Sequence, residues 1–221
     1  MIGLALLGLG KGSSFLVVFA LAYFVDAALV GQYSVIFSFI IINGTIASLG
    51  LHQVIMKFSP IWRRDGIRVR NDYLILVAVS LIATCSISTN LLSLYLPDFF
   101  LSGEITNQLE QSFVLITSIC FLYALNQFLC FYQLAQNRSA HFLFFLYVIQ
   151  PVSLLLQIIF FGTYFELGLE VVLKAFLASY LIAVVFNLLF SKAIEFKANQ
   201  SGSVNFFDIG VYALTVLTSS I

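Results

Sequence analysis

The residues in this chain that could do chemistry are a few polar side chains embedded in long apolar runs. They are one cation, one imidazole and six amides: Lys11, Asn43, His52, Gln53, Asn126, Gln127, Gln150 and Asn187. Polar groups are costly inside a membrane, and they usually face protein or a water-filled cavity. These residues are therefore candidates for the lining of a substrate cavity. Hydrogen bonding between helices is the alternative for the amides.

Each of the strongest candidates has two interpretations. Lys11 lies well inside the first apolar run, where it either extends to the membrane interface or lines a cavity for an anionic substrate. His52 and Gln53 lie near the end of the second run, where hydrogen bonding at the interface is the alternative to substrate binding. Gln150 precedes Pro151, which is expected to break the hydrogen-bond ladder of the helix in the fifth run. The freed carbonyl groups then either line a cavity or are satisfied by neighbours.

No set of catalytic or metal-ligating residues emerges from the sequence. The two histidines, His52 and His141, belong to different runs or their edges, and no pair of carboxylates lies within an apolar run. The three cysteines, Cys85, Cys120 and Cys130, fall inside apolar runs without metal-ligand spacing. We therefore expect no catalytic residue, no metal and no cofactor, and we expect that the protein is not an enzyme.

The composition indicates a polytopic membrane protein. Of the 221 residues, 61% are hydrophobic and 9% are charged, whereas a soluble domain carries roughly 25% charged residues. The formal net charge is zero, which by itself argues neither for nor against nucleic acid, and no nucleic-acid partner is predicted. The distribution of the charges is more informative than their sum.

The apolar runs predict an all-α fold, a polytopic membrane helix bundle with six transmembrane helices and the start of a seventh. The six are expected at about 3–25, 33–56, 73–96, 112–135, 142–162 and 168–191, and the seventh begins at about residue 206. Residues 1–205 would form one N-terminal lobe, and residues 206–221 the truncated seventh helix. Gly8 and Gly12 form a G-x-x-x-G pattern, and Gly44, Ser48 and Gly50 form a similar small face, both typical of helix packing.

The basic residues predict the orientation. The loop after the second run carries Lys57, Arg63, Arg64, Arg68 and Arg70. Lysines and arginines stay on the cytoplasmic side of a membrane, and with the predicted helices nearly all of them lie on one side, Lys174 excepted. The N-terminus is therefore expected to be cytoplasmic. The same basic loop fits contact with anionic lipids, and a role in gating the substrate is the alternative.

Several short motifs near the N-terminus resemble a known family. Gly31-Gln-Tyr33-Ser34 follows the first run, Gly44 and Leu49-Gly50-Leu51 lie in the second, and His52-Gln-Val-Ile-Met-Lys57 comes next. Together with the long basic loop and the spacing of six runs, they resemble the O-antigen (Wzx-type) flippases of the multidrug/oligosaccharidyl-lipid/polysaccharide exporter superfamily. The resemblance covers residues 1–65 in motif and the whole chain in topology.

The resemblance implies a transporter of two lobes, each of six helices, of which this chain holds the N-terminal one. Such a flippase moves an undecaprenyl-diphosphate-linked oligosaccharide across the bacterial inner membrane by alternating access, for the synthesis of surface polysaccharide such as the O-antigen of lipopolysaccharide. A central cavity lined by cations would receive the diphosphate and the sugar. The implied partners are this lipid-linked substrate, membrane lipids, and a polysaccharide polymerase or a second transporter lobe.

The chain departs from the family at the outer end of the first run. Many members carry Ala-Arg where this sequence has Ala22-Tyr23, and the glycine of the following turn is replaced by Asp26. Both changes argue against an anion site at that end. Three alternatives remain open: a cation-coupled drug exporter of the same superfamily, a polytopic glycan polymerase or acyltransferase, and an inactive remnant. The exporter would favour an acidic residue within a helix, and the enzyme would need a large outer loop with catalytic residues.

Overall fold

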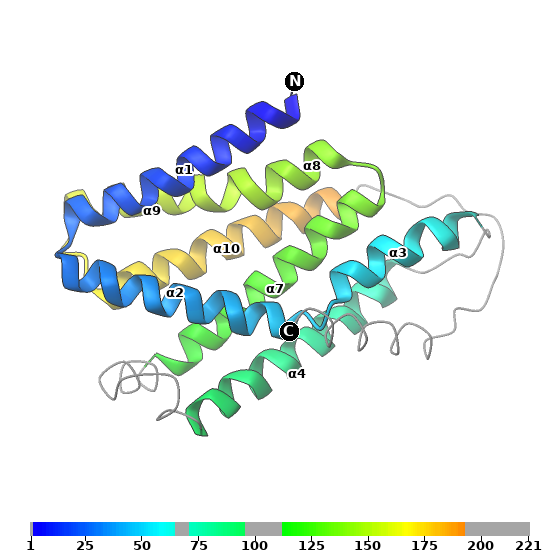
Figure 1. Ribbon diagram of the computed structural model, residues 1–221, viewed down its shortest axis with the longest axis horizontal. Helices are drawn as coiled ribbons and strands as arrows, with labels where there is room; N and C mark the ends of the chain where they lie inside the picture. The colour runs from blue at the N-terminus through cyan, green and yellow to red at the C-terminus, as the bar shows by residue number, and fades with distance from the viewer. Residues whose placement is uncertain (1, 65–70, 96–111, 193–221) are drawn as a thin grey trace.

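The computed structural model describes residues 2–64, 71–95 and 112–192, and these ranges are almost entirely helical (Figure 1). The helices are α1 (Ile2–Phe24), α2 (Ala27–Ala47), α3 (Leu51–Arg64), α4 (Asn71–Tyr95), α7 (Phe113–Ala135), α8 (Ser139–Phe144), the π-helical turn η1 (Phe145–Ile149), α9 (Gln150–Tyr164) and α10 (Leu169–Lys192). No strand occurs within these ranges. The predicted all-α class is confirmed.

Five helical stretches in the described ranges are long and apolar enough to cross a membrane. They are Gly3–Phe24, Ala27–Ala47, Phe113–Ala135, Ser139–Tyr164 and Leu169–Phe190. The predicted third span coincides with α4, whose described apolar stretch, Val77–Leu92, is shorter than a full crossing. The predicted seventh helix from residue 206, and also Arg68 and Arg70, lie outside the described residues. The coarse prediction of a multi-pass membrane bundle therefore stands.

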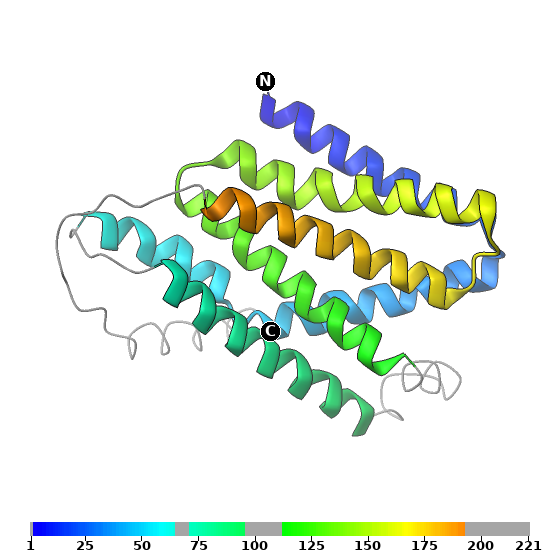
Figure 2. The same cartoon turned by 180° about the vertical axis from the view of Figure 1, so that it is seen from behind.

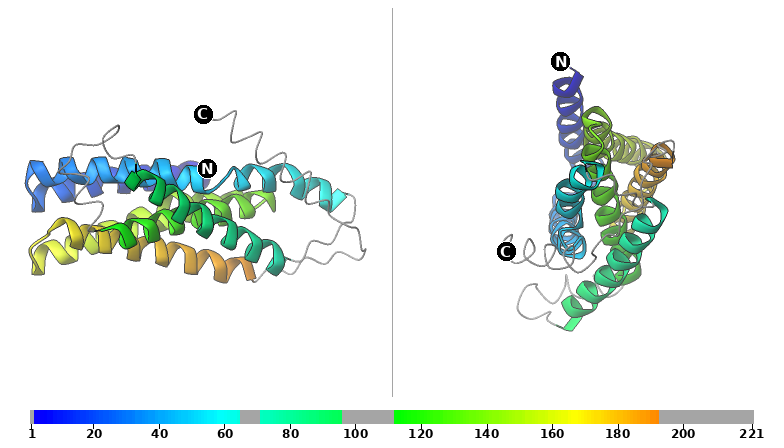
Figure 3. Two further views of the ribbon diagram at one scale, coloured as in Figure 1. Left: turned by 90° about the horizontal axis from the view of Figure 1, so that it is seen from below. Right: turned by 90° about the vertical axis from the view of Figure 1, so that its right-hand side faces the viewer.

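The helices run back and forth between two ends of the bundle. The α1–α2 turn and the α9–α10 connection meet at one end, whereas the end of α3 and the α7–α8 connection lie toward the other (Figure 1, Figure 2). Viewed from below, α1, α2 and α3 form one layer and α9 and α10 another (Figure 3). Helix α7 lies between them and contacts α2, α3, α4 and α10.

The two ends differ in charge. Asp26, Glu166 and Glu170 lie at the end with the α1–α2 turn, which we term the acidic end. Arg64 and Arg138 lie at the other, which we term the basic end. This separation follows from the alternating direction of the helices. It is the pattern from which the orientation was predicted, and the orientation itself stays a prediction.

Helix α2 begins and ends earlier than its apolar run predicts. It begins at Ala27 because Asp26 caps it: the Asp26 carboxylate accepts a hydrogen bond of 2.9 Å from the backbone N–H of Leu29. It ends at Ala47 because Leu49 and Gly50 adopt left-handed backbone angles, with φ of 47° and 66°. The predicted span 33–56 is therefore wrong at both ends, since hydropathy does not register a cap or a turn made of apolar residues.

The residues after this turn belong to a separate helix. His52 and Gln53 lie on α3. The sequence had predicted that they lie at the end of a transmembrane helix. Lys57, Arg63 and Arg64 lie on the same helix, so this part of the predicted basic loop is wrong. The left-handed turn at Leu49 and Gly50 is followed by a new helix, α3. The sequence predicted a loop for the second half of this helix.

The fifth span is continuous and longer than predicted. Ser139–Tyr164 crosses Pro151 without a break, and the π-helical turn η1 lies directly before it. A π-turn widens the helix locally and re-routes its hydrogen bonds. The predicted break at Pro151 is therefore replaced by a local widening.

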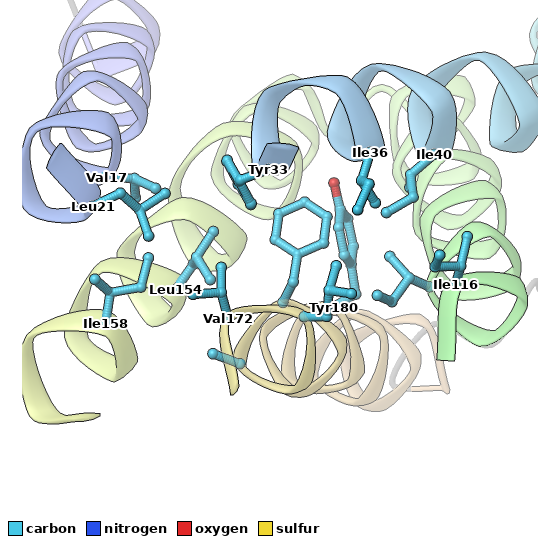
Figure 4. Close-up of a cluster of buried hydrophobic side chains, with 14 of the residues drawn as sticks. Val17, Leu21, Tyr33, Ile36, Ile40, Ile116, Leu154, Ile158, Val172 and Tyr180 are labelled. Atoms are coloured by element: carbon cyan, nitrogen blue, oxygen red, sulfur yellow. The ribbon is translucent and has the colours of Figure 1, made fainter. Parts of the chain in front are cut away.

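The core consists of apolar side chains that converge from several helices. In Figure 4, Tyr33, Ile36 and Ile40 of α2 lie opposite Val172 and Tyr180 of α10. A second cluster joins α7 to α3 and α4. Many large apolar side chains of α1 and α10 instead face outward. Such outward apolar surface is what lipid would cover.

Candidate functional site

The candidate site begins where α1 crosses the π-helical turn. A Cβ atom added at Gly10 would overlap the carbonyl oxygen of Tyr147 and lie 2.6 Å from the Tyr147 Cβ. Pro151 cannot supply the N–H that an α-helix would direct to this same carbonyl. A glycine is therefore needed here for the two backbones to come so close.

This close approach places the next residue over an aromatic ring. The Lys11 Nζ lies 5.5 Å from the centroid of the Tyr147 ring, within the range of a cation–π interaction. The Lys11 side chain is exposed and Tyr147 is half-buried. The cation therefore sits on an aromatic surface and is still accessible to a ligand.

Three further rings continue from Tyr147 toward α3. The centroids of Tyr147 and Phe142 are 6.4 Å apart, those of Phe142 and Phe131 are 5.2 Å apart, and those of Phe131 and His52 are 4.8 Å apart. All four ring-bearing side chains are half-buried. We term Lys11, Tyr147, Phe142, Phe131 and His52 the aromatic band. It joins α1, η1, α8, α7 and α3 through side-chain contacts.

The imidazole at the far end of the band is held neutral. Burial lowers the pKa of His52, because removal from water disfavours the charged form. Its Nδ1 atom is buried and has no hydrogen-bond partner among the residues that the structure describes. The band therefore offers a positive charge at Lys11, apolar ring faces in the middle and a neutral polar group at His52.

The sequence identified the two polar ends of this band but not its middle. Lys11 and His52 are conspicuous because polar residues are rare in apolar runs. Phe131, Phe142 and Tyr147 are aromatic residues among the 16% of the chain that is Phe, Trp or Tyr, so composition hides them. Only the packing of α7 and α8 brings their rings into contact. No feature of the sequence alone distinguishes them from core aromatics.

Two other candidates lie in a buried cluster between α7 and α10. The Gln133 Nε2 donates to the Asn187 Oδ1 at 3.4 Å, and the Asn187 Nδ2 donates to the Cys130 Sγ at 3.2 Å. The Cys130 thiol donates to the Asn126 Oδ1 at 3.8 Å. All four side chains are at most 2% exposed. We term them the buried network, and its place fits hydrogen bonding between helices.

The remaining candidates also have partners or lie outside the band. The Gln150 Nε2 donates to the Ser179 Oγ at 3.3 Å, the Gln127 Nε2 donates to the Tyr123 hydroxyl at 3.2 Å, and the buried Asn43 Nδ2 donates to the Phe39 carbonyl at 3.0 Å. Gln53 is exposed on α3. The structure thus brings Lys11 and His52 into one band and Asn126 and Asn187 into the buried network, and it places the other four candidates elsewhere.

Comparison of the chain with protein families, curated proteins and solved structures gives no match. The function is therefore argued from the geometry of the aromatic band. A lysine on an aromatic ring can bind a phosphate group, because opposite charges attract strongly where water is scarce. Ring faces can pack against the C–H groups of a sugar or against an apolar chain.

Proposed function

We propose that the chain is the N-terminal lobe of a flippase that moves an undecaprenyl-diphosphate-linked oligosaccharide across the bacterial inner membrane. The observation that carries this proposal is the aromatic band, with Lys11 at one end and a run of half-buried rings beside it. The chain acts here as a binding and transport element that needs no catalytic residue, metal or cofactor. Its membrane-spanning helices are the setting that such a substrate requires.

The chemistry of the band fits the two parts of this substrate. Lys11 supplies the positive charge for the diphosphate, and two opposite unit charges 4 Å apart attract by about 4 kcal/mol at an effective dielectric constant of 20. The rings of Tyr147, Phe142 and Phe131 supply flat apolar surfaces for sugar rings. His52, which is neutral, supplies a hydrogen-bonding group beyond them.

The position of the band fits entry of the substrate from the cytoplasm. His52 follows the α2–α3 turn, Phe131 lies in the last turns of α7, and Phe142 lies in α8, directly after the α7–α8 connection. This places the band in the half of the bundle near the basic end. Basic residues remain on the cytoplasmic side, so a substrate that arrives from that side meets the band first.

The proposal is tested by binding of the lipid-linked oligosaccharide to the purified full chain in nanodiscs. Lys11→Ala should weaken binding by roughly tenfold, which corresponds to about 1.4 kcal/mol. Lys11→Arg should retain part of the affinity, since the charge is kept. Lys174→Ala is the matched control, because Lys174 lies near the acidic end and pairs with Glu170 at 2.7 Å.

Complementation of a flippase-deficient bacterial strain gives the functional readout. The full-length gene with Lys11→Ala should restore less surface polysaccharide than the unmodified gene at equal protein level, and the Lys174→Ala gene should restore as much. Equal affinity and equal polysaccharide for the Lys11→Ala and Lys174→Ala proteins would refute the assignment of Lys11 to the diphosphate.

A further inference from the structure

Helices α1 and α9 each carry an outward row of large side chains that ends in a tyrosine. The row on α1 is Phe15, Phe19 and Tyr23, and the row on α9 is Leu156, Phe160 and Tyr164. The members of each row are four residues apart, so they share one face of their helix. All six side chains are more than half exposed. We term them the two outward rows.

The two helices lie side by side and in step along the bundle (Figure 1). The backbones approach closely where Gly10 meets Tyr147, and again where a Cβ added at Gly162 would lie 2.5 Å from the ring of Phe24. The tyrosines that end the rows adjoin this second contact, one residue before it on α1 and two residues after it on α9. Both tyrosines therefore lie at the same level, at the acidic end.

This level is also where charged residues begin on both helices. No Asp, Glu, Lys or Arg occurs between Lys11 and Asp26 or between Arg138 and Glu166. Asp26 follows the tyrosine of α1 by three residues, Glu166 follows the tyrosine of α9 by two, and both carboxylates are exposed. Along each row the surface thus changes from apolar side chains to a phenol and then to a carboxylate.

Tyrosine suits the boundary between hydrocarbon and water. Its ring is apolar and its hydroxyl is polar, and tyrosines are enriched at the two interfaces of a bilayer. The order along each row is the order of acyl chains, headgroups and water. A contact with a second protein would not require this order to recur on two helices at one level.

The length of α1 agrees with a bilayer boundary at this level. The hydrocarbon core of a bilayer, about 30 Å thick, is crossed by about 20 helical residues. Counted back from Tyr23, this length reaches Gly3, where the apolar span Gly3–Phe24 begins. With the phenol of Tyr23 at the boundary, the core therefore covers the whole apolar length of α1.

We propose that the two outward rows face lipid, with the hydroxyl groups of Tyr23 and Tyr164 at the phospholipid headgroups and the other four side chains among the acyl chains. The partner of this surface is the bilayer itself. Lys11 precedes Tyr23 by 12 residues, which is about 18 Å at 1.5 Å per residue, so the ammonium lies at the level of the hydrocarbon core. This proposal does not depend on the transport proposal.

The experiment measures the depth of four positions with one tryptophan reporter at a time. The full chain has a single tryptophan, Trp62, which is replaced by phenylalanine. The reporters are Tyr23→Trp and Tyr164→Trp, and their matched controls are Phe15→Trp and Leu156→Trp, which lie eight residues, or about 12 Å, deeper in the same rows. Each protein is placed in nanodiscs of phosphatidylcholine that carries bromine, a quencher of tryptophan fluorescence, near the headgroup or near the end of the acyl chain.

Bromine near the headgroup should quench Tyr23→Trp and Tyr164→Trp more strongly than bromine near the chain end does. The order should be reversed for Phe15→Trp and Leu156→Trp. Stronger quenching of the two tyrosine positions by the deep bromine, or equal profiles at all four positions, would overturn the proposal. Weak quenching throughout would show that a second protein chain covers the rows, and would overturn it too. If Trp62→Phe lowers the midpoint of thermal unfolding, Trp62 is kept and its signal in the unmodified chain is subtracted.

Discussion

Two polar regions of this bundle behave in opposite ways. The buried network between α7 and α10 consists of Asn126, Cys130, Gln133 and Asn187, which bond to one another and are almost fully buried. The aromatic band consists of half-buried rings with an exposed cation at one end and an imidazole at the other. Both regions place polar groups among apolar helices. Only the band leaves a charged group, the ammonium of Lys11, accessible to another molecule.

The difference shows which polar residues in a membrane bundle are candidates for binding. An amide that is satisfied by the neighbouring helix contributes to helix association, at about 0.6 kcal/mol per hydrogen bond on average in a membrane. A cation that rests on a ring and remains exposed has no such internal role. Sequence alone treats the two kinds alike, because both are polar residues in apolar runs.

The largest expected effect comes from the contact that positions the band. Gly10→Ala should destabilise the protein by about 2 kcal/mol, because the new methyl group overlaps the Tyr147 carbonyl and forces α1 away from η1. Thermal unfolding in nanodiscs measures the change. Substrate affinity should fall together with stability, since Lys11 moves with α1.

Two neighbouring glycines provide the control for this substitution. A Cβ added at Gly8 or Gly12 meets nothing within 4 Å, so Gly8→Ala and Gly12→Ala should leave stability unchanged or raise it by up to about 1 kcal/mol through helix propensity. The G-x-x-x-G pattern thus does not mark the contact between α1 and the π-turn, which uses Gly10. Equal destabilisation at all three positions would contradict the close approach at Tyr147.

The second prediction concerns the buried network. Asn187→Ala should cost about 1–2 kcal/mol of stability, because it removes two hydrogen bonds and leaves a small cavity between α7 and α10. At a temperature where the variant is folded, its affinity for the lipid-linked oligosaccharide should equal that of the unmodified chain. If the Asn187→Ala protein has normal stability and binds the substrate poorly, Asn187 belongs to the binding site and does not have a purely structural role.

The third prediction separates ring chemistry from packing in the band. Tyr147→Leu keeps an apolar side chain but removes the ring beneath Lys11, so stability should change by less than about 1 kcal/mol while substrate affinity falls severalfold. Tyr164→Leu is the matched control, because Tyr164 is 72% exposed and lies near the acidic end of the bundle. Affinity that is equal in the two variants would exclude the ring of Tyr147 from the binding site.

The sequence predicted the class of the fold and most helix positions because long apolar runs have few structural solutions in a membrane. It failed at α2 and α3, where the Asp26 cap and the left-handed turn at Leu49 and Gly50 decide the boundaries. Leucine in a left-handed conformation is uncommon, and an apolar residue at a turn leaves no trace in hydropathy. The same limit applies at Pro151, where a π-turn takes the place of the predicted break.

Only the two polar ends of the aromatic band could be predicted from the sequence. Lys11 and His52 are rare residue types in their surroundings, so the sequence marks both. Their connection through Phe131, Phe142 and Tyr147 depends on contacts between helices distant in the chain. Asn126 and Asn187 are, like Lys11, polar residues in apolar runs. The structure nevertheless places both in the buried network, where each is hydrogen-bonded to a neighbouring side chain. Polarity identifies residues that need a partner, and only packing shows whether the protein supplies it.

The smallest expected effect is a dependence of stability on pH that belongs to the band and not to the buried network, whose amides do not titrate. Burial lowers the pKa of His52 from its ordinary value of 6.5, so the unfolded chain binds a proton at a higher pH than the folded chain does. The stability that neutral His52 permits is therefore fully present above pH 6.5 and declines as the pH falls toward the lower pKa of the folded state. His52→Gln keeps a polar, uncharged side chain and should remove this part of the decline, whereas His141→Gln, the matched control on α8, should keep it. Thermal unfolding of the three proteins at a series of pH values on both sides of 6.5 measures the difference. If the decline is as steep in His52→Gln as in the unmodified chain, the imidazole is not buried against Phe131 and the band ends at the phenylalanine.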